Sequence, residues 1–248
     1  MGIVRKDLTQ RLCRITGFGD LAFLFLSGQG HAGQVISYAQ QTQEVLDRFS
    51  VMLDDIGSSR DELLSATLWI AEIGEIKAVQ NAWDEWIGPR LPPALTIVEG
   101  RLATSEKVIE AGLIARRTPS STHPVESSSM TEIHRLVIND QPRISRVVTY
   151  GNLVFLAGVT APNASSDMLT QVRQVLDRID GFLAEGGSDK HHILSATVWL
   201  ADIRNISLMN EVWDEWVSKT SPPARATVEA RLASPQLQIE IGIIAASA

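Results

Sequence analysis

The sequence predicts an α+β protein built from two similar domains, and three observations support this. Residues 65–115 align with residues 195–245 at a constant offset of 130, with 24 identities in 51 positions. Each copy shows the same order of strand and helix patterns, ββαβαββ, which predicts one sheet with two helices on one face. A serine- and proline-rich stretch between the copies cannot form a core. The predicted boundaries are a domain at 1–116, a linker at 117–130 and a domain at 131–248.

The elements are clearest in the second copy. Residues 146–150 and 153–157 read as a hairpin around Gly151-Asn152. Apolar residues at three- and four-residue steps then predict a helix that ends at Gly186-Gly187. The remaining pattern predicts a strand at 196–201 and then a second helix that carries Trp213 and Trp216. Two final strands are predicted at 226–233 and 237–245. The face of this sheet without helices needs a cover, and another copy of the domain is the simplest one.

Composition limits the possible functions. The apolar content of 44% and charged content of 21% are typical of a globular protein. The net charge of −7 argues against a nucleic-acid partner, because phosphate binding depends on Lys and Arg. The single cysteine, Cys13, excludes an internal disulfide, and no apolar run is long enough to cross a bilayer. We therefore expect a soluble cytoplasmic protein, without nucleic-acid or membrane partners, that acts on a small molecule.

Three weaker motifs favour structural interpretations. Gly28-Gln-Gly-His-Ala-Gly33 has glycine spacing found in dinucleotide sites, but it follows a hairpin strand and has no counterpart in the second copy, so we expect a flexible loop. His191-His192 lacks metal-ligand spacing and is expected at the surface. The Trp-Asp-Glu-Trp pairs place two tryptophans on one helical face, as expected for core packing.

The two copies differ most in the strand after the double proline. In the second copy one face carries Arg225, Thr227, Glu229 and Arg231. The corresponding face of the first copy reads Leu95, Ile97, Glu99 and Arg101. A planar guanidinium binds a carboxylate bidentately, so the second copy is equipped for a small anion and the first is not.

The last strand adds an acid, Glu240, matched by Glu110 in the first copy. One hypothesis is a cross-strand ion pair with Arg231, repeated as Glu110 with Arg101. The other is a carboxylate that orients or deprotonates water.

Residues Pro223-Ala-Arg-Ala-Thr-Val-Glu229 and Ile239-Glu-Ile-Gly-Ile-Ile-Ala245, with Leu-Ala-Gly at 156–158, resemble the signature of the RidA/YjgF family. Its members are imine and enamine deaminases, also known as endoribonuclease L-PSP or translation-initiation inhibitors. The resemblance covers both copies and is more specific in the second. It implies a chorismate-mutase-like fold, trimeric rings of domains and ligand clefts between adjacent domains. Three two-domain chains would then complete two rings.

The resemblance also implies roles for individual residues. Arg225 would hold the substrate carboxylate, and Glu240 would act on water or the iminium. Asn210, replaced by Gln80 in the first copy, matches a cleft asparagine; Thr227 and the backbone of Gly158 would line the ligand. Two positions depart from the family: Ala157 replaces a common serine, which Ser27 keeps before Gly28, and Gly242 replaces a frequent second acid.

Hydrolysis of an imino acid needs a fixed carboxylate, a placed water and proton transfer, so no metal or organic cofactor is required. The leading hypothesis is a cofactor-free deaminase of small 2-imino and enamine carboxylic acids that assembles as a homo-oligomer. The alternative is a non-catalytic protein in which the same cleft binds a carboxylate metabolite. Ribonuclease activity is disfavoured by the acidic charge and by the absence of a basic, aromatic-rich strip.

Overall fold

The computed structural model describes residues 3–8, 13–28, 37–117, 132–136 and 143–248. The predicted linker from residue 118 onward and most of the Gly28–Gly33 loop lie outside these ranges. The elements of the first copy are β1 (Ile3–Leu8), β2 (Cys13–Phe18), β3 (Leu21–Ser27), α1 (Tyr38–Asp55), β4 (Leu63–Ile70), α2 (Ile76–Ile87), β5 (Ala94–Glu99) and β6 (Ile109–Arg116).

The second copy repeats this order. Its elements are β7 (His134–Leu136), β8 (Val147–Tyr150), β9 (Leu153–Thr160), α3 (Met168–Glu185), β10 (Ile193–Leu200), α4 (Ile206–Trp216), β11 (Ala224–Glu229) and β12 (Ile239–Ala246). Short 3₁₀ turns, Arg60–Glu62, Ile73–Glu75 and Ile203–Asn205, precede β4, α2 and α4.

Each copy forms a six-stranded mixed sheet, in the order β1-β2-β3-β6-β4-β5 and β11-β10-β12-β9-β8-β7. The predicted α+β class and the repeated ββαβαββ order are confirmed, and each sheet gains one more strand at its start. The β4–β5 and β10–β11 pairs are parallel because a helix crosses over between their strands. In these strand orders β5 and β11 are edge strands, so Arg225 lies on an edge of its sheet.

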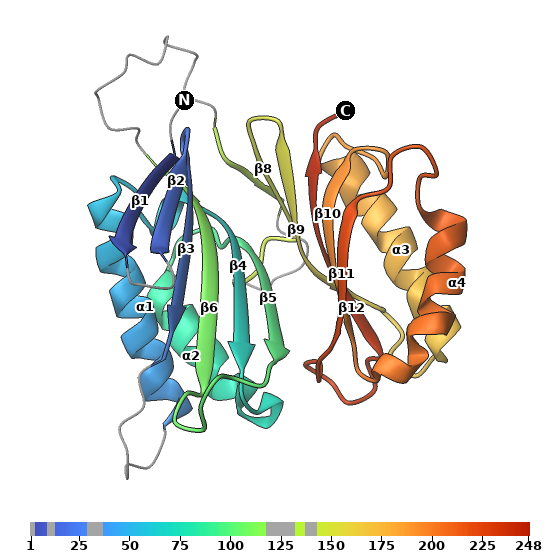
Figure 1. Cartoon of the computed structure of the whole chain (residues 1–248), viewed down its shortest axis with the longest axis horizontal. Coiled ribbons are helices and arrows are strands. Elements are labelled where there is room, and N and C mark those ends of the chain that lie inside the picture. The colour runs from blue at the N-terminus through green and yellow to red at the C-terminus, as the bar shows by residue number, and fades with distance from the viewer. Residues whose placement is uncertain (1–2, 9–12, 29–36, 118–131, 137–142) are drawn as a thin grey trace.

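The helices cover the outer face of each sheet, and the two open faces are directed toward each other (Figure 1). One core lies between each sheet and its helices, as alternation of apolar residues requires. Ser37 and Asp167 begin α1 and α3 by accepting hydrogen bonds from backbone N–H groups in the first turn. Trp83 and Trp213 are both buried, so the core interpretation of the tryptophan pairs is confirmed at these positions.

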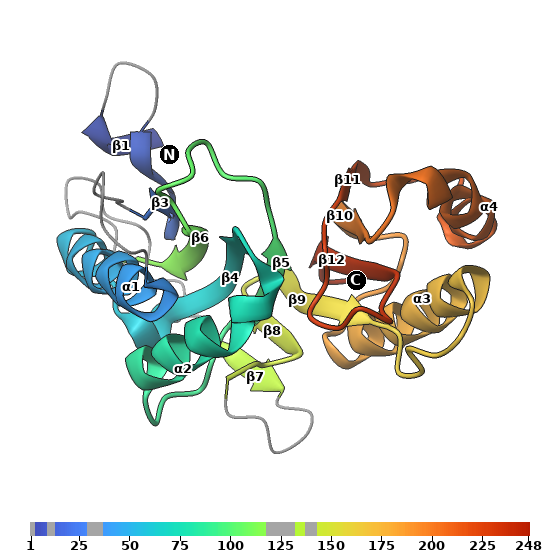
Figure 2. The ribbon, with the colours of Figure 1, turned by 90° about the horizontal axis from the view of Figure 1, so that it is seen from below.

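The seam between the copies joins β5 of the first to β9 of the second, which lie side by side in Figure 2. Two small apolar clusters fill it, one around Phe155 and one around Trp199. Polar contacts cross it: Arg143 makes a bidentate ion pair with Asp84, and the Glu99 N–H donates to the Arg231 carbonyl at 2.9 Å. The sheet face without helices, for which the sequence predicts a cover, is therefore covered in part by the other copy within the same chain.

The penultimate strand is shorter than expected, since β11 ends at Glu229 rather than at residue 233. Ala230 still donates to Leu200 at the end of β10, whereas the Arg231 carbonyl accepts from the Glu99 N–H across the seam, so the chain turns away from the sheet there. In the described ranges no helix is long and apolar enough to span a membrane, and no group of three or more His, Cys, Asp or Glu side chains is arranged to hold a metal ion.

Candidate functional site

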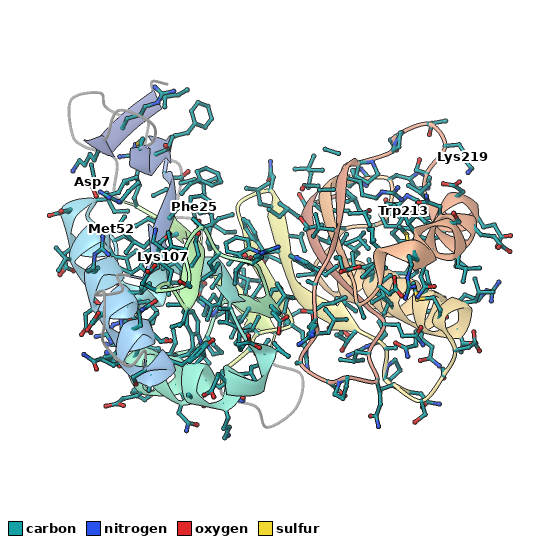
Figure 3. The ribbon with its side chains drawn as sticks, turned by 60° about the horizontal axis from the view of Figure 1, so that its bottom comes forward. Asp7, Phe25, Met52, Lys107, Trp213 and Lys219 are labelled. Carbon is teal, nitrogen blue, oxygen red and sulfur yellow. The ribbon has the colours of Figure 1, made fainter. Side chains whose placement is uncertain are left out.

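Arg225 lies on the edge strand β11 and is exposed, but its side chain is held in place. One terminal nitrogen donates to the Asn210 side-chain oxygen at 2.9 Å, and the guanidinium carbon lies 5.0 Å from the centre of the Trp213 ring. Both partners belong to α4, so the helix orients the cation. We call Arg225, Asn210, Thr227 and Trp213 the edge cluster. Figure 3 shows Trp213 on the side of the second copy away from the first.

Thr227 is two residues further along the same face of β11. Its hydroxyl is covered and has no hydrogen-bond partner among the described residues. In the first copy the matching positions, Leu95 and Ile97, are buried in the core beneath the helices. The change from aliphatic side chains to Arg and Thr therefore places a cation and a hydroxyl at this edge of the core.

Glu240 lies in β12, on the open face of the second sheet and against the seam. Its side chain is 5% exposed and accepts no hydrogen bond within the described chain. A Cβ built on Gly158 would lie 1.8 Å from a Glu240 carboxyl oxygen and 3.0 Å from the Thr96 hydroxyl. Glycine is required there because the carboxyl group occupies the space of a side chain. The hydroxyl of Thr96 comes from β5 of the first copy.

Burial raises the pKa of Glu240 to about 8, and the nearby Arg146 guanidinium opposes this increase. Arg146 directly precedes β8, is partly buried and forms no ion pair with Glu240. Burial also lowers the pKa of Arg146. We call Glu240, Gly158, Thr96 and Arg146 the seam cluster.

The structure does not bring Arg225 and Glu240 into one cleft. In the strand registers Thr227 is opposite Val198, whereas Glu240 is opposite Trp199, the next residue of β10. Successive residues of a strand point to opposite faces, so Arg225 and Thr227 face the helices and Glu240 faces the seam. The predicted site residues thus divide into Arg225, Asn210 and Thr227 on the edge, and Glu240 and Gly158 in the seam.

The cross-strand ion-pair hypothesis for Glu240 is wrong. Arg231 lies 3.5 Å from Glu99 of the other copy, and the charge that acts on Glu240 is Arg146. Arg101 and Glu110 likewise form no ion pair in the described ranges. The two final strands of each copy are not neighbours, because β10 lies between β11 and β12 and β4 lies between β5 and β6, so their charged residues cannot align across a hairpin.

The sequence analysis treats Ser27-Gly28 as the counterpart of Ala157-Gly158, and the strand registers show that this alignment is wrong. Ser27 is opposite Glu110, but the residue opposite Glu240 is Thr160, because β9 has a bulge between its pairings with Ile241 and Ile243. The first copy has no bulge there and no equivalent of Gly158. A bulge adds one residue and redirects the chain, which is how Gly158 comes to lie under Glu240.

The sequence analysis missed Arg146 and Thr96. A signal existed for Arg146: Arg14-Ile-Thr-Gly-Phe-Gly-Asp-Leu21 and Arg146-Val-Val-Thr-Tyr-Gly-Asn-Leu153 align at an offset of 132. Ladder pairings bear this out, since Ile15 is opposite Leu24 as Val147 is opposite Leu156. Thr96 could not be found in this way, because its role depends on which strand of the other copy reaches it.

A third feature lies between the two open sheet faces. A cavity of about 150 Å³ is lined by matched residues of both copies, including Thr67 with Thr197 and Trp69 with Trp199. Its lining does not include Arg225 or Glu240.

Together these features define a tandem α+β protein with a cation on one domain edge and a buried acid at its domain seam. The chain matches the family described as "Endoribonuclease L-PSP" twice, over residues 20–117 and 138–247. It belongs to that family, and each domain is one copy of the family fold.

Similar proteins each correspond to one copy. A "RutC family protein" of Haemophilus ducreyi is 44% identical over 104 residues, which is 42% of this chain and 89% of that protein. "RutC family protein YoaB" of Escherichia coli is 39% identical over 109 residues, covering 44% of this chain and 95% of its own. The crystal structure of NMB1025, a YjgF family member from Neisseria meningitidis, shares 41% identity, with 48% of this chain and 98% of that one covered and a TM-score of 0.44.

A solved structure also matches both copies together. A chorismatase crystal structure aligns with 99% of this chain and 80% of its own, with a TM-score of 0.71 and 16% identity. At that identity the similarity is one of fold, and it extends to a pair of domains within one chain.

Proposed function

We propose that the protein is a cofactor-free hydrolytic deaminase of small 2-imino and enamine carboxylic acids. Water would add to the imine carbon, and the carbon–nitrogen bond of the resulting carbinolamine would break to give keto acid and ammonia. The observation that carries the proposal is Arg225, an exposed cation that Asn210 and Trp213 hold in place. A carboxyl group of the last strand, Glu240 or its counterpart Glu110, would exchange a proton with the bound water.

Arg225 supplies the carboxylate-binding group in this proposal. Asn210 occupies one of its terminal nitrogens, and the remaining N–H groups are available at the exposed edge of β11. Trp213 beneath the guanidinium limits its movement, which reduces the entropy lost when a substrate binds. Because the Thr227 hydroxyl is covered, it makes no direct contact with the substrate in this proposal.

The Arg225 cleft needs an acid from a second chain, because Glu240 faces the intrachain seam. Within the chain, the contact between β5 and the second copy brings Thr96 to Glu240. We infer that the same contact, made between β11 and the first copy of another chain, places Ala226, the counterpart of Thr96, against Glu110, with Arg225 as the next residue of the same edge strand. Such head-to-tail contacts generate homo-oligomers.

Charged residues also meet at the intrachain seam, where Arg231 pairs with Glu99. The matching residues, Arg101 and Glu229, line the same pocket and make no ion pair among the described residues. We propose a head-to-tail assembly that retains the intrachain seam, and trimeric rings of domains from three chains stay the expectation that the family resemblance implies.

The test generates 2-iminobutyrate in the cuvette and follows the release of 2-ketobutyrate and ammonia. Arg225→Ala removes about two charge-assisted hydrogen bonds of roughly 1.5–3 kcal/mol each, so we expect turnover of carboxylate substrates to fall about 10²- to 10⁴-fold. Arg204→Ala is the control, since Arg204 is an exposed arginine of the same domain that pairs locally with Asp202. Wild-type turnover in Arg225→Ala would refute the role of Arg225.

The separation of Arg225 from Glu240 favours one alternative, a non-catalytic protein that binds a carboxylate metabolite at the edge cluster. Titration calorimetry with 2-ketobutyrate distinguishes the two. Binding that depends on Arg225, without any acceleration of imine hydrolysis, would support the alternative and contradict the deaminase proposal.

A further inference from the structure

The cavity between the two open sheet faces is lined by the same residue types from both copies. Its volume is about 150 Å³, and strands β4 and β6 of the first copy and β10 and β12 of the second contribute to its walls. Three residues of β4 are matched by three of β10: Ser65, Thr67 and Trp69 by Ser195, Thr197 and Trp199. Alternate residues of a strand share one face, so each set points away from the helices and toward the cavity.

The polar groups of these two sets have no partner among the described residues. All four Ser and Thr side chains are partly buried, and none of their hydroxyls makes a hydrogen bond there. The indole N–H groups of Trp69 and Trp199 make none either. In contrast, the indole N–H groups of Trp86 and Trp216 donate to side chains of the neighbouring helix. The cavity therefore offers donors and acceptors that a bound molecule can use.

Aromatic rings form much of the apolar lining, and glycines make room for them. A Cβ built on Gly242 of β12 would lie 3.2 Å from the ring of Trp199. A Cβ on Gly112, the matching residue of β6, would lie 2.5 Å from the ring of Phe25. A side chain at either position would displace the ring that now lies on the backbone. The two glycines thus keep the rings against the sheets and the space between the sheets open.

The size and charge of the cavity limit what it can hold. Its lining includes no Asp, Glu, Lys, Arg or His among the described residues. An ion would lose its hydration there without gaining a charged partner, so a neutral molecule is favoured. A protein cavity of about this volume holds one benzene-sized molecule. We propose that this cavity is a binding site for a neutral molecule with one aromatic ring and one hydroxyl group, the chemistry of phenol.

Each part of such a ligand has a matching group in the cavity. Its ring would pack against Trp69 and Trp199, which belong to one apolar cluster, and aromatic pairs are favoured beyond the area that they bury. Its hydroxyl would donate to and accept from the Ser and Thr hydroxyls. The site goes beyond the proposed deaminase function, because its lining includes neither Arg225 nor Glu240 and it does not take a carboxylate. Its failure would leave the turnover assay with 2-iminobutyrate unaffected.

The experiment compares 4-fluorophenol with fluorobenzene, which lacks the hydroxyl. Each probe is titrated with the full chain and followed by its fluorine NMR line width. We expect one site per chain and about 5- to 10-fold tighter binding of 4-fluorophenol, the effect of one net hydrogen bond. Thr67→Val combined with Thr197→Val removes two hydroxyls with little change of shape and should abolish this preference while fluorobenzene still binds. Thr149→Val, in β8 and outside the lining, is the matched control and should bind both probes as wild type does.

A second variant, Ser195→Ile, fills the cavity from β10 and should weaken the binding of both probes by about 10-fold or more. Absence of line broadening with wild type at millimolar concentrations would show that the cavity holds water only and would overturn the proposal. Equal binding of 4-fluorophenol by wild type and Ser195→Ile would place the probe elsewhere and would also overturn it. Equal binding of the two probes by wild type would refute the proposed class of ligand. Circular dichroism melts establish that each variant is folded, and if Ser195→Ile does not fold, the double Thr→Val variant carries the test.

Discussion

Replacing Glu240 by glutamine tests whether this carboxyl group is buried without a partner. Its pKa is raised from 4.5 to about 8, so between these values the folded chain binds a proton that the unfolded chain has released. Stability therefore falls as the pH rises through this window. The penalty is absent below about pH 4.5 and complete above about pH 8.

The size of the effect follows from the shift. A pKa raised from 4.5 to about 8 corresponds to roughly 5 kcal/mol of folding free energy lost across the window, an upper value because a buried carboxylate can recruit water. Glu240→Gln cannot ionise and should remove this part of the pH dependence. We expect the free energy of unfolding of the variant, relative to wild type, to improve by several kcal/mol between pH 5 and pH 9.

Urea unfolding at pH 5, 7 and 9, followed by tryptophan fluorescence, measures the effect. Glu110→Gln is the matched control, since it makes the same chemical change at the corresponding, partly exposed position of the first copy. We expect its unfolding curves to follow wild type at each pH. Parallel pH dependence in wild type and Glu240→Gln would refute the assignment of an unpartnered buried acid.

Further predictions concern packing and the seam. Gly158→Ala places a methyl group 1.8 Å from the Glu240 carboxyl and should lower the thermal midpoint by several degrees, whereas Gly181→Ala, in α3 with nothing within 4 Å, should stabilise by about 0.5–1 kcal/mol. Equal effects of the two changes would contradict the crowding at Gly158. Arg143→Ala breaks the partly buried pair with Asp84 across the seam, so limited proteolysis should cleave between the domains faster than in wild type. An unchanged cleavage rate would indicate that the seam does not depend on this pair.

The sequence alone determined the repeat and the class of fold, and it provides the proposed site residues. Repetition at an offset of 130 indicated two domains, and apolar periodicity indicated which face of each helix is buried. The contrast between Arg225 and Leu95 marked the edge of β11 as the place where the copies differ in chemistry. These features depend on local spacing, which is why they can be read from one chain.

Tertiary structure decided which of those residues meet. In the strand registers Val198 of β10 is opposite Thr227, and the next residue, Trp199, is opposite Glu240. Adjacent residues of a strand face opposite sides of the sheet, so Thr227 and Arg225 lie on one side and Glu240 lies on the other. Thr96 reaches Glu240 because β5 of one copy lies against β9 of the other, and Gly158 lies beneath it because of a bulge of a single residue. Long-range packing sets these distances and the burial that raises the pKa of Glu240, and neither is encoded in the spacing of residues along the chain.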